Sequence, residues 1–377
     1  MSDRHRLGRL VAAGAVLGTV GFLLSAEFLP GVAHAATPAP RTQAVAPVTV
    51  APAQNPDPNG SHGPSAAERA AQRAARQAAK RAEAARKVRV TWDKRGRPHR
   101  MAVVRYNRID VVTDGRLTRQ AGRGSGANTI TTLDRALPSD WLTTSGDTAT
   151  LSAMIVLTPG TSLTVEDPVK RLELVGGATP QDAAAIHTGS GRVALKGVTV
   201  TSIDPATRQA VAPASQGRPY FSVSARGRFE AVDSTIADLG TASTGIEGAR
   251  AGVTFNRGAT GSLVRTTLQR NTTGVELSRS NAVHLEDVTF TESTGDGLVL
   301  TGDRGTTMSG IRAIGNGDNG VVVSGESTGR PVTGITTSGN GGYGVVVMGQ
   351  TGAELSGIDT TRDQAGGLRI NRSADVH

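Results

Sequence analysis

Gly-Val-Glu-Leu (274–277) is the first of five short runs that recur along the chain, followed by Gly-Leu-Val-Leu (297–300), Gly-Val-Val-Val (320–323), Gly-Val-Val-Val (344–347) and Gly-Leu-Arg-Ile (367–370). The runs begin 23, 23, 24 and 23 residues apart. A fixed period of this length is typical of solenoid proteins. In each run two aliphatic residues lie two positions apart, which predicts a short strand with one buried face.

Three further columns keep the same period. Two are apolar: Leu263, Leu285, Met308, Val332, Leu355, and Val288, Ile311, Ile335, Ile358. The third is polar: Asn271, Ser293, Asn316, Asn340, Asp363. Asn and Asp tolerate tight turns and bond nearby backbone groups, so this column predicts a structural ladder. No helix-length apolar pattern fits between the columns. The sequence therefore predicts a parallel β-helix with coils about 4.8 Å apart.

This repeat resembles that of the secreted right-handed parallel β-helix proteins. That pectate-lyase-like superfamily includes pectate lyases, mannuronan C5-epimerases and uncharacterised actinobacterial proteins. The resemblance covers roughly residues 150–377 and implies an all-β, right-handed parallel β-helix. In the enzymes of the superfamily, the resemblance implies a site on an outward strand face that uses carboxylates, basic residues and sometimes Ca²⁺.

The composition fits a stack of tight turns over an aliphatic core. The chain has 377 residues, 48 of them Gly, with 3% aromatic residues and a net charge of +9. So few aromatic residues do not suit an aromatic-lined sugar cleft. The chain has no Cys, which excludes disulfides, a Cys-ligated metal and a Cys nucleophile.

The N-terminal part predicts export. Residues 1–35 have a basic start, an apolar run at 10–24 and an Ala-His-Ala cleavage site at 33–35, typical of a signal peptide. The apolar run of about 15 residues is short for a membrane span, so we expect no stable span after cleavage, although an uncleaved anchor stays an alternative. Residues 36–65 are rich in Pro and Ala and predict a disordered linker.

Residues 66–87 predict a basic helix. Its five Arg and two Lys outnumber two Glu, and its only apolar residue is Ala, so it has no stripe for inserting into lipid. Either it is a solvated spacer, or it is a cationic tether that holds polyanionic wall polymers through charge.

Residues 88–150 predict an N-terminal cap that covers the first coil, with Trp92 and Trp141 packed inside it. The β-helix itself is expected at 151–377, with 204–219 as a long loop that leaves the stack. The chain ends soon after a strand and its turn, so either its last coil is an edge for self-association or further coils are missing from the sequence.

The outward position of the first strand supplies the candidate site. In coil order the alignment reads His187, Ser222, Thr254, Glu276, Val299, Val322, Val346, Arg369. His187 as a base with Glu276 as its partner is the one catalytic pair this row offers, yet the two lie three coils apart, about 14 Å. The three valines predict an exposed apolar strip, covered by a side loop or by another protein.

Other chemistry finds little support in the sequence. The Asp-Pro-His-Asp motif of the mannuronan epimerases is absent, and the nearest string is Glu-Asp-Pro-Val (166–169). His284 is expected to point outward. Asp296, Asp303 and Asp318 lie in Gly-rich turns, where calcium is conceivable but turn chemistry accounts for Asp. The sequence predicts no cofactor beyond that calcium.

Three functions stay open. The sequence favours an exported, non-catalytic β-helix that binds anionic extracellular polysaccharide or the cell envelope, with no specific nucleic-acid partner. The first alternative is a polysaccharide lyase or uronate C5-epimerase with a loop-built site. The second is a structural, self-assembling surface protein.

Overall fold

The computed structural model describes residues 98–377 apart from 123–125, 242–248 and 326–331, together with positions 70, 72, 73 and 76. The chain divides into two compact units, Met1–Gly63 and Pro64–His377. The predicted signal peptide and linker lie outside the described residues, as does most of the predicted basic helix. The four described positions inside that helix are helical and exposed.

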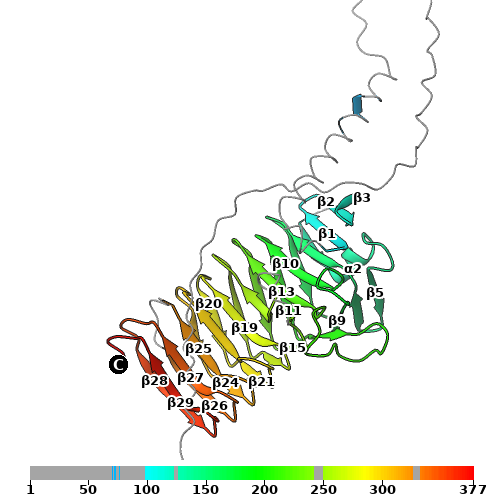
Figure 1. Cartoon of the computed structure of the whole chain (residues 1–377). Coiled ribbons are helices and arrows are strands. Elements are labelled where there is room, and N and C mark those ends of the chain that lie inside the picture. The colour runs from blue at the N-terminus through cyan, green and yellow to red at the C-terminus, as the bar shows by residue number, and fades with distance from the viewer. Residues whose placement is uncertain are drawn as a thin grey trace, which may run out of the picture. The chain divides into compact units, whose positions relative to one another are not determined.

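The described coils form a right-handed parallel β-helix (Figure 1). Successive strands of one coil enter three different sheets, which we call A, B and C, so each strand pairs with its counterpart one coil away. In spatial order, sheet A contains β3 (Arg116–Gly122), β2 (Arg108–Thr113), β1 (Arg100–Arg105), β7 (Met154–Leu157), β10 (Ala185–Gly189), β13 (Tyr220–Ser224), β16 (Ala251–Phe255), β19 (Thr273–Ser278), β22 (Leu298–Thr301), β25 (Val321–Ser324), β27 (Tyr343–Met348) and β29 (Gly366–Asn371).

Sheets B and C follow the same order. Sheet B contains β4 (Ala127–Thr129), β8 (Ser162–Val165), β11 (Arg192–Lys196), β14 (Arg228–Val232), β17 (Thr260–Val264), β20 (Val283–Glu286) and β23 (Thr307–Ser309). Sheet C contains β5 (Leu142–Ser145), β6 (Thr148–Leu151), β9 (Arg171–Val175), β12 (Thr199–Ile203), β15 (Thr235–Ala237), β18 (Thr267–Gln269), β21 (Thr289–Thr291), β24 (Ile311–Ile314), β26 (Val332–Ser338) and β28 (Leu355–Thr361).

The predicted apolar files are confirmed. Each residue of one such file pairs with the next coil's residue, in the order Val275, Leu298, Val321, Val345 and Leu368. The first four of these side chains are fully buried. Burying one such side chain contributes roughly 1.5–3 kcal/mol, so the repeated pairs are a major source of stability.

The Gly that opens each run is required by the close approach of backbones. A Cβ at Gly274 would overlap the carbonyl oxygen of Gly297, and a Cβ at Gly297 would overlap that of Gly320. Neighbouring coils therefore meet at this position without room for a side chain.

The predicted polar ladder is confirmed for Asn271, Asn316, Asn340 and Asp363, but not for Ser293, whose buried hydroxyl has no described hydrogen-bond partner. Asn316 and Asn340 are buried, and the backbone N–H of Asn316 donates to Asn340 Oδ1 at 3.0 Å. Asn340 N–H donates to Asp363 Oδ1 at 3.0 Å, and Ser293 N–H donates to Asn316 Oδ1 at 3.0 Å. Each side chain thus accepts from a turn amide of the preceding coil.

Antiparallel strands cover the N-terminal side of sheets A and C. β2 pairs antiparallel with β1 and β3, and β5 pairs antiparallel with β6. A short helix, α2 (Ile130–Asp134), begins with a capping box at Thr129. Trp141 is buried in the main core. Parallel pairing between coils begins before residue 151, because β1 pairs with β7, β4 with β8 and β6 with β9.

The last described coil differs from those before it. Leu368 and Ile370 occupy the inward positions of β29, yet they are 44% and 47% exposed. β29 is the final strand of sheet A among the described residues, so no described coil covers this pair.

Candidate functional site

The outward row of sheet A lies as the sequence predicts. His187 pairs with Ser222, Ser222 with Thr254, and Thr254 with Glu276. The file continues through Val299, Val322 and Val346 to Arg369. His187 and Glu276 are therefore three rungs apart, about 14 Å, and the structure does not bring them together.

His187 sits where this row changes from apolar to polar. Its neighbour on one side is Val156, part of a second buried cluster on the outer face of sheet A that includes Met101, Val103, Met154 and Tyr220. On the other side its Nε2 lies 3.2 Å from Ser224 Oγ. Burial lowers the pKa of His187 from 6.5 to about 4, so the imidazole is neutral at neutral pH.

The Ser224–His187 contact has the residue types of a nucleophile and its base, but the imidazole of His187 is a weak base. A general base works best when its pKa is near the working pH, and about 4 is well below that range. Glu276 is too distant to orient the ring. Further along, Asn256 Nδ2 donates to Ser222 Oγ at 3.4 Å. These contacts hold the outer face in place and do not assemble a strong proton-transfer site.

The valine strip is less exposed than predicted. Val299 and Val322 point outward but are half-buried, and Val346 is buried. β-branched side chains on adjacent rungs shield one another across the inter-strand spacing. The register confirms that the three valines point outward, but their side chains are less exposed than predicted.

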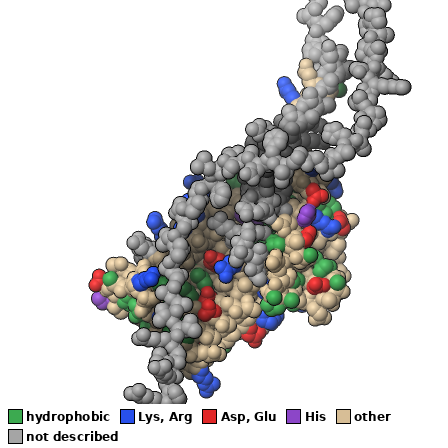
Figure 2. Space-filling view, in the orientation of Figure 1, with side chains coloured by type: hydrophobic (Ala, Val, Ile, Leu, Met, Phe, Trp, Pro, Cys, Tyr) green, Lys and Arg blue, Asp and Glu red, His purple; other side chains and the backbone are tan. Residues whose placement is uncertain are grey.

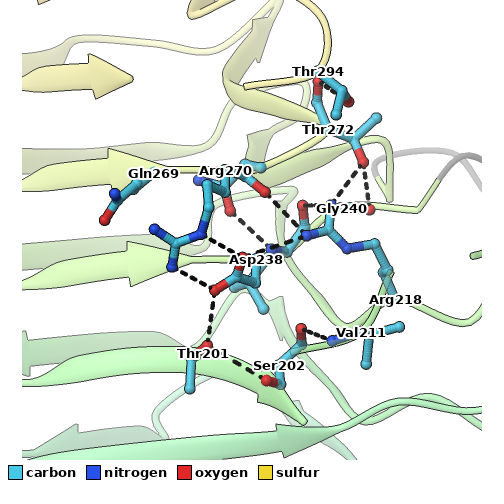
Figure 3. Close-up of polar contacts among 12 residues, drawn as sticks. Thr201, Ser202, Val211, Arg218, Asp238, Gly240, Gln269, Arg270, Thr272 and Thr294 are labelled. Carbon is cyan, nitrogen blue, oxygen red and sulfur yellow. Dashed lines mark hydrogen bonds and ion pairs between the residues drawn. The ribbon is translucent and has the colours of Figure 1, made fainter. Parts of the chain in front are cut away.

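A charged network around the buried Asp238 lies at the corner between sheets C and A (Figure 3). Arg270 donates from Nε and Nη2 to the two carboxylate oxygens of Asp238, both at 2.9 Å, and Thr201 donates to the same carboxylate at 3.2 Å. Arg218, from the 204–219 loop, is fully buried. Its nearest Asp238 oxygen is 3.9 Å away.

Arg218 fastens this loop to the coil. Its guanidinium donates to the carbonyl oxygens of Leu239 at 3.3 Å and Arg270 at 3.0 Å, and to Thr272 Oγ1 at 3.3 Å. Burial lowers the pKa of Arg218 to about 10, opposed by Asp238, so it stays charged at neutral pH. The network is a structural clamp that holds the 204–219 loop on the coil. The Pro-rich composition of this loop did not predict it.

The remaining acidic and imidazole groups are dispersed. His284 points outward and is exposed, as predicted, with Glu286 Oε2 3.1 Å from its Nε2. Asp303 is buried and accepts a hydrogen bond from Ser280. Desolvation raises the pKa of Asp296, which accepts from Asn319 Nδ2 at 2.9 Å. Within the described ranges, no three His, Cys, Asp or Glu side chains gather as a metal site.

Comparison with known proteins supports the same architecture. Residues 228–376 match the family model described as NosD, periplasmic copper-binding protein. A double mutant of the periplasmic alginate epimerase AlgG superposes with a TM-score of 0.57 at 13% identity, covering 67% of this chain and 67% of that chain. Another AlgG structure gives a TM-score of 0.51 at 11% identity, covering 67% and 84%. No curated protein sequence matches the chain.

The chain is a right-handed parallel β-helix protein. The matched family description names copper, so the donor set of this β-helix was compared with that metal. Its sequence has no Cys, and the described part gathers no three imidazole or carboxylate ligands. No set of imidazole, thiolate or carboxylate groups in the described part therefore fits a copper site.

The visible face of the coil is mostly uncharged, with basic and acidic side chains in small groups (Figure 2). On sheet B, Arg192 and Arg228 both bond Glu230, and these hydrogen bonds lower the pKa of Glu230 although desolvation raises it. Arg265 is paired with Asp233 at 2.7 Å. The sequence indicated the outward row but not these pairs, because the Arg192–Glu230 and Arg265–Asp233 contacts each join residues on neighbouring coils.

Proposed function

We propose that this β-helix protein is exported and binds anionic extracellular polysaccharide without transforming it. The observation that carries the proposal is the distribution of charge along the sequence. Residues 98–377 contain 26 Lys and Arg and 26 Asp and Glu, whereas residues 1–97 contain 15 and 6. The whole excess of +9 therefore precedes a coil body with no net charge.

This distribution assigns the attraction of polyanions to the N-terminal segment and the structural support to the β-helix. A dense basic segment attracts polyanions over a Debye length, about 8–10 Å at ordinary salt, and salt weakens that attraction. The β-helix provides a rigid neutral body behind it. The predicted signal peptide supports export, and the likeness of the coil to periplasmic AlgG is consistent with a polysaccharide partner. Among the described residues, no helix is long and apolar enough to cross a membrane.

The non-catalytic part of the proposal follows from the outer face of sheet A. Its imidazole is a weak base, its carboxylate is three rungs away, and valines occupy the next rungs. A lyase or epimerase needs a poised base and charge-stabilising groups around one sugar ring. A lyase or uronate epimerase stays the alternative, and the same experiment separates it.

The experiment incubates the full-length protein with alginate, pectate and wall teichoic acid. We expect salt-sensitive co-sedimentation with at least one polymer and no product. New unsaturated-uronate absorbance would show a lyase, and a changed uronate ratio by NMR would show an epimerase. Either product, lost in a His187→Gln or Ser224→Ala variant, would overturn the non-catalytic proposal.

A matched pair of variants tests the charge argument. Replacing the seven Lys and Arg of residues 66–87 with Gln should abolish most of the binding at low salt. Glu68→Gln with Glu83→Gln changes the charge of the same segment in the opposite sense and should strengthen binding. Equal affinities of both variants would refute the role of the basic segment.

Self-association is a second candidate, favoured by the exposed apolar pair Leu368 and Ile370 at the edge of β29. An edge strand with free backbone groups and exposed aliphatic side chains is a template for pairing with another chain. Analytical ultracentrifugation over a range of concentrations tests it.

A further inference from the structure

Four arginines line one edge of the coil, in the turns that join sheet A to sheet B. Arg226 follows β13, Arg257 follows β16, Arg279 follows β19 and Arg304 follows β22. These strands are consecutive neighbours in sheet A. The four residues therefore belong to four successive coils, and we refer to them as the arginine row.

The four arginines lie in equivalent turns but do not all share one register position, because Val223 pairs with Phe255, which aligns Arg226 with Gly258, and Arg304 aligns with Asn281. Phe255 pairs with Leu277, so Arg257 and Arg279 occupy equivalent positions two residues later. Gly258 N–H donates to the carbonyl oxygen of Arg279 at 2.9 Å, which joins these two turns. Arg304 forms a parallel bridge with Asn281, two residues beyond Arg279.

The charges of the row are not paired with any described residue. All four side chains are exposed, and none of them forms a side-chain hydrogen bond or ion pair with a described residue. Arg192 and Arg228, by contrast, are both bound to Glu230. Asp303, next to Arg304 in sequence, is buried and accepts a hydrogen bond from Ser280.

Neighbouring guanidinium groups without a described counter-charge repel one another and attract anions. Coils recur about every 4.8 Å, so the row extends over roughly 14 Å with about one positive charge per step. A compact anion would contact only part of such a row. A linear polymer running along the coil axis, with one carboxylate per sugar ring, would present charges at a comparable interval.

We infer that the arginine row is a binding site on the coil for a linear polyuronate, which lies along the axis and places successive carboxylates against successive arginines. The inference deepens the proposed function and rests on it, but it assigns a site on the coil body separate from the basic segment. Arg is suited to this role because its planar guanidinium can bind a carboxylate with two hydrogen bonds.

The test compares three full-length proteins: the native chain, a row variant and a charge-matched control. The row variant carries Arg226→Gln, Arg257→Gln, Arg279→Gln and Arg304→Gln. The control carries Arg116→Gln, Arg119→Gln, Arg312→Gln and Arg362→Gln, which remove four arginines that are equally exposed and equally without a described side-chain partner. Both variants lose the same charge, so only position differs.

Affinities for oligomannuronate and oligogalacturonate of two to eight residues are measured by calorimetry at low salt. We expect the row variant to bind the longer oligomers about tenfold more weakly than the control. Each exposed arginine–carboxylate pair changes the affinity by less than a factor of ten, and four such pairs together reach about tenfold. The affinity of the native chain should rise with oligomer length until the row is filled, and the row variant should lose this length dependence.

A second readout locates the ligand directly. In an Arg279→Lys variant, carbodiimide coupling should join a uronate carboxylate to the new amine at position 279, and Arg312→Lys should give no such product. Equal affinity of row variant and control, or coupling at 312 as readily as at 279, would overturn the site while leaving the proposed function intact. Failure of the native chain to bind any polyanion would instead overturn the proposed function. Tight binding of teichoic acid in place of the uronates would overturn the ligand class.

Discussion

Asn340→Ala would remove the fourth of the five members of the polar ladder. The side chain of Asn340 is fully buried and takes part in four hydrogen bonds. Its Nδ2 donates to Ala313 O at 3.0 Å and Asp363 Oδ1 at 2.7 Å, and its Oδ1 accepts from the backbone N–H and Nδ2 of Asn316 at 3.0 and 2.9 Å. Alanine makes none of these bonds.

The expected cost follows from that count. A net hydrogen bond contributes about 1 kcal/mol, and a buried partner left unsatisfied costs about 1–3 kcal/mol. Four lost bonds, partly relieved by relaxation of the turn, should lower the free energy of unfolding by about 3–4 kcal/mol. A loss of this size is a large fraction of the stability of a typical domain.

Urea unfolding followed by far-UV circular dichroism measures the effect, with Asn281→Ala as control. Asn281 is exposed and has no described side-chain hydrogen bond, so its replacement should stay within about 0.5 kcal/mol. Because solenoid stability is roughly a sum over coils, amide exchange should show the loss concentrated in the turns after β24 and β26. If Asn340→Ala costs no more than the control, the ladder does not stabilise the coil as described.

Three further predictions concern other groups. The pKa of His187 falls from 6.5 to about 4 on folding, so the unfolded chain binds a proton first as the pH falls. The stability present above about pH 6.5 should therefore decrease by roughly 3 kcal/mol towards pH 4, and His187→Gln should flatten this profile. An NMR titration midpoint near 6.5 for His187 would contradict the burial argument. Arg218→Met removes three hydrogen bonds, although Leu239 O keeps the one from Thr272 N–H at 2.9 Å, and at about 1 kcal/mol for each bond it should cost about 3 kcal/mol in urea unfolding. The exposed Arg208→Met should cost less than about 1 kcal/mol, and similar costs for both would show that Arg218 does not stabilise the loop. Leu368→Glu should shift sedimentation towards monomer if the β29 edge associates, and an unchanged oligomer distribution would exclude that edge.

Much of the fold was predictable because a solenoid is locally repetitive. The spacing of Gly274, Gly297, Gly320 and Gly344 already determined which residues stack, and the observed pairs Val275–Leu298 and Leu298–Val321 follow that alignment. The same alignment placed His187, Ser222, Thr254 and Glu276 in one outward file. Registers can be read from sequence here because a slip would turn every apolar residue outward.

Exposure and partners were not predictable in the same way. The sequence shows that Val346 points outward, but not that it is buried. It shows Arg218 in a Pro-rich loop, but not that the side chain enters the corner beside Asp238. Such properties depend on how a loop folds back and on contacts between coils, which follow no period.

The coil, its period, its inward and outward faces and the concentration of positive charge before residue 98 could all be read from the amino-acid sequence, because each depends on residue type and spacing. Which charges are paired became clear only from the folded chain. Arg192 and Arg228 converge on Glu230, whereas Arg226, Arg257, Arg279 and Arg304 line a turn edge without a described counter-charge. Pairing is a matter of distance between side chains on different coils, and distance is set only when the coils are stacked.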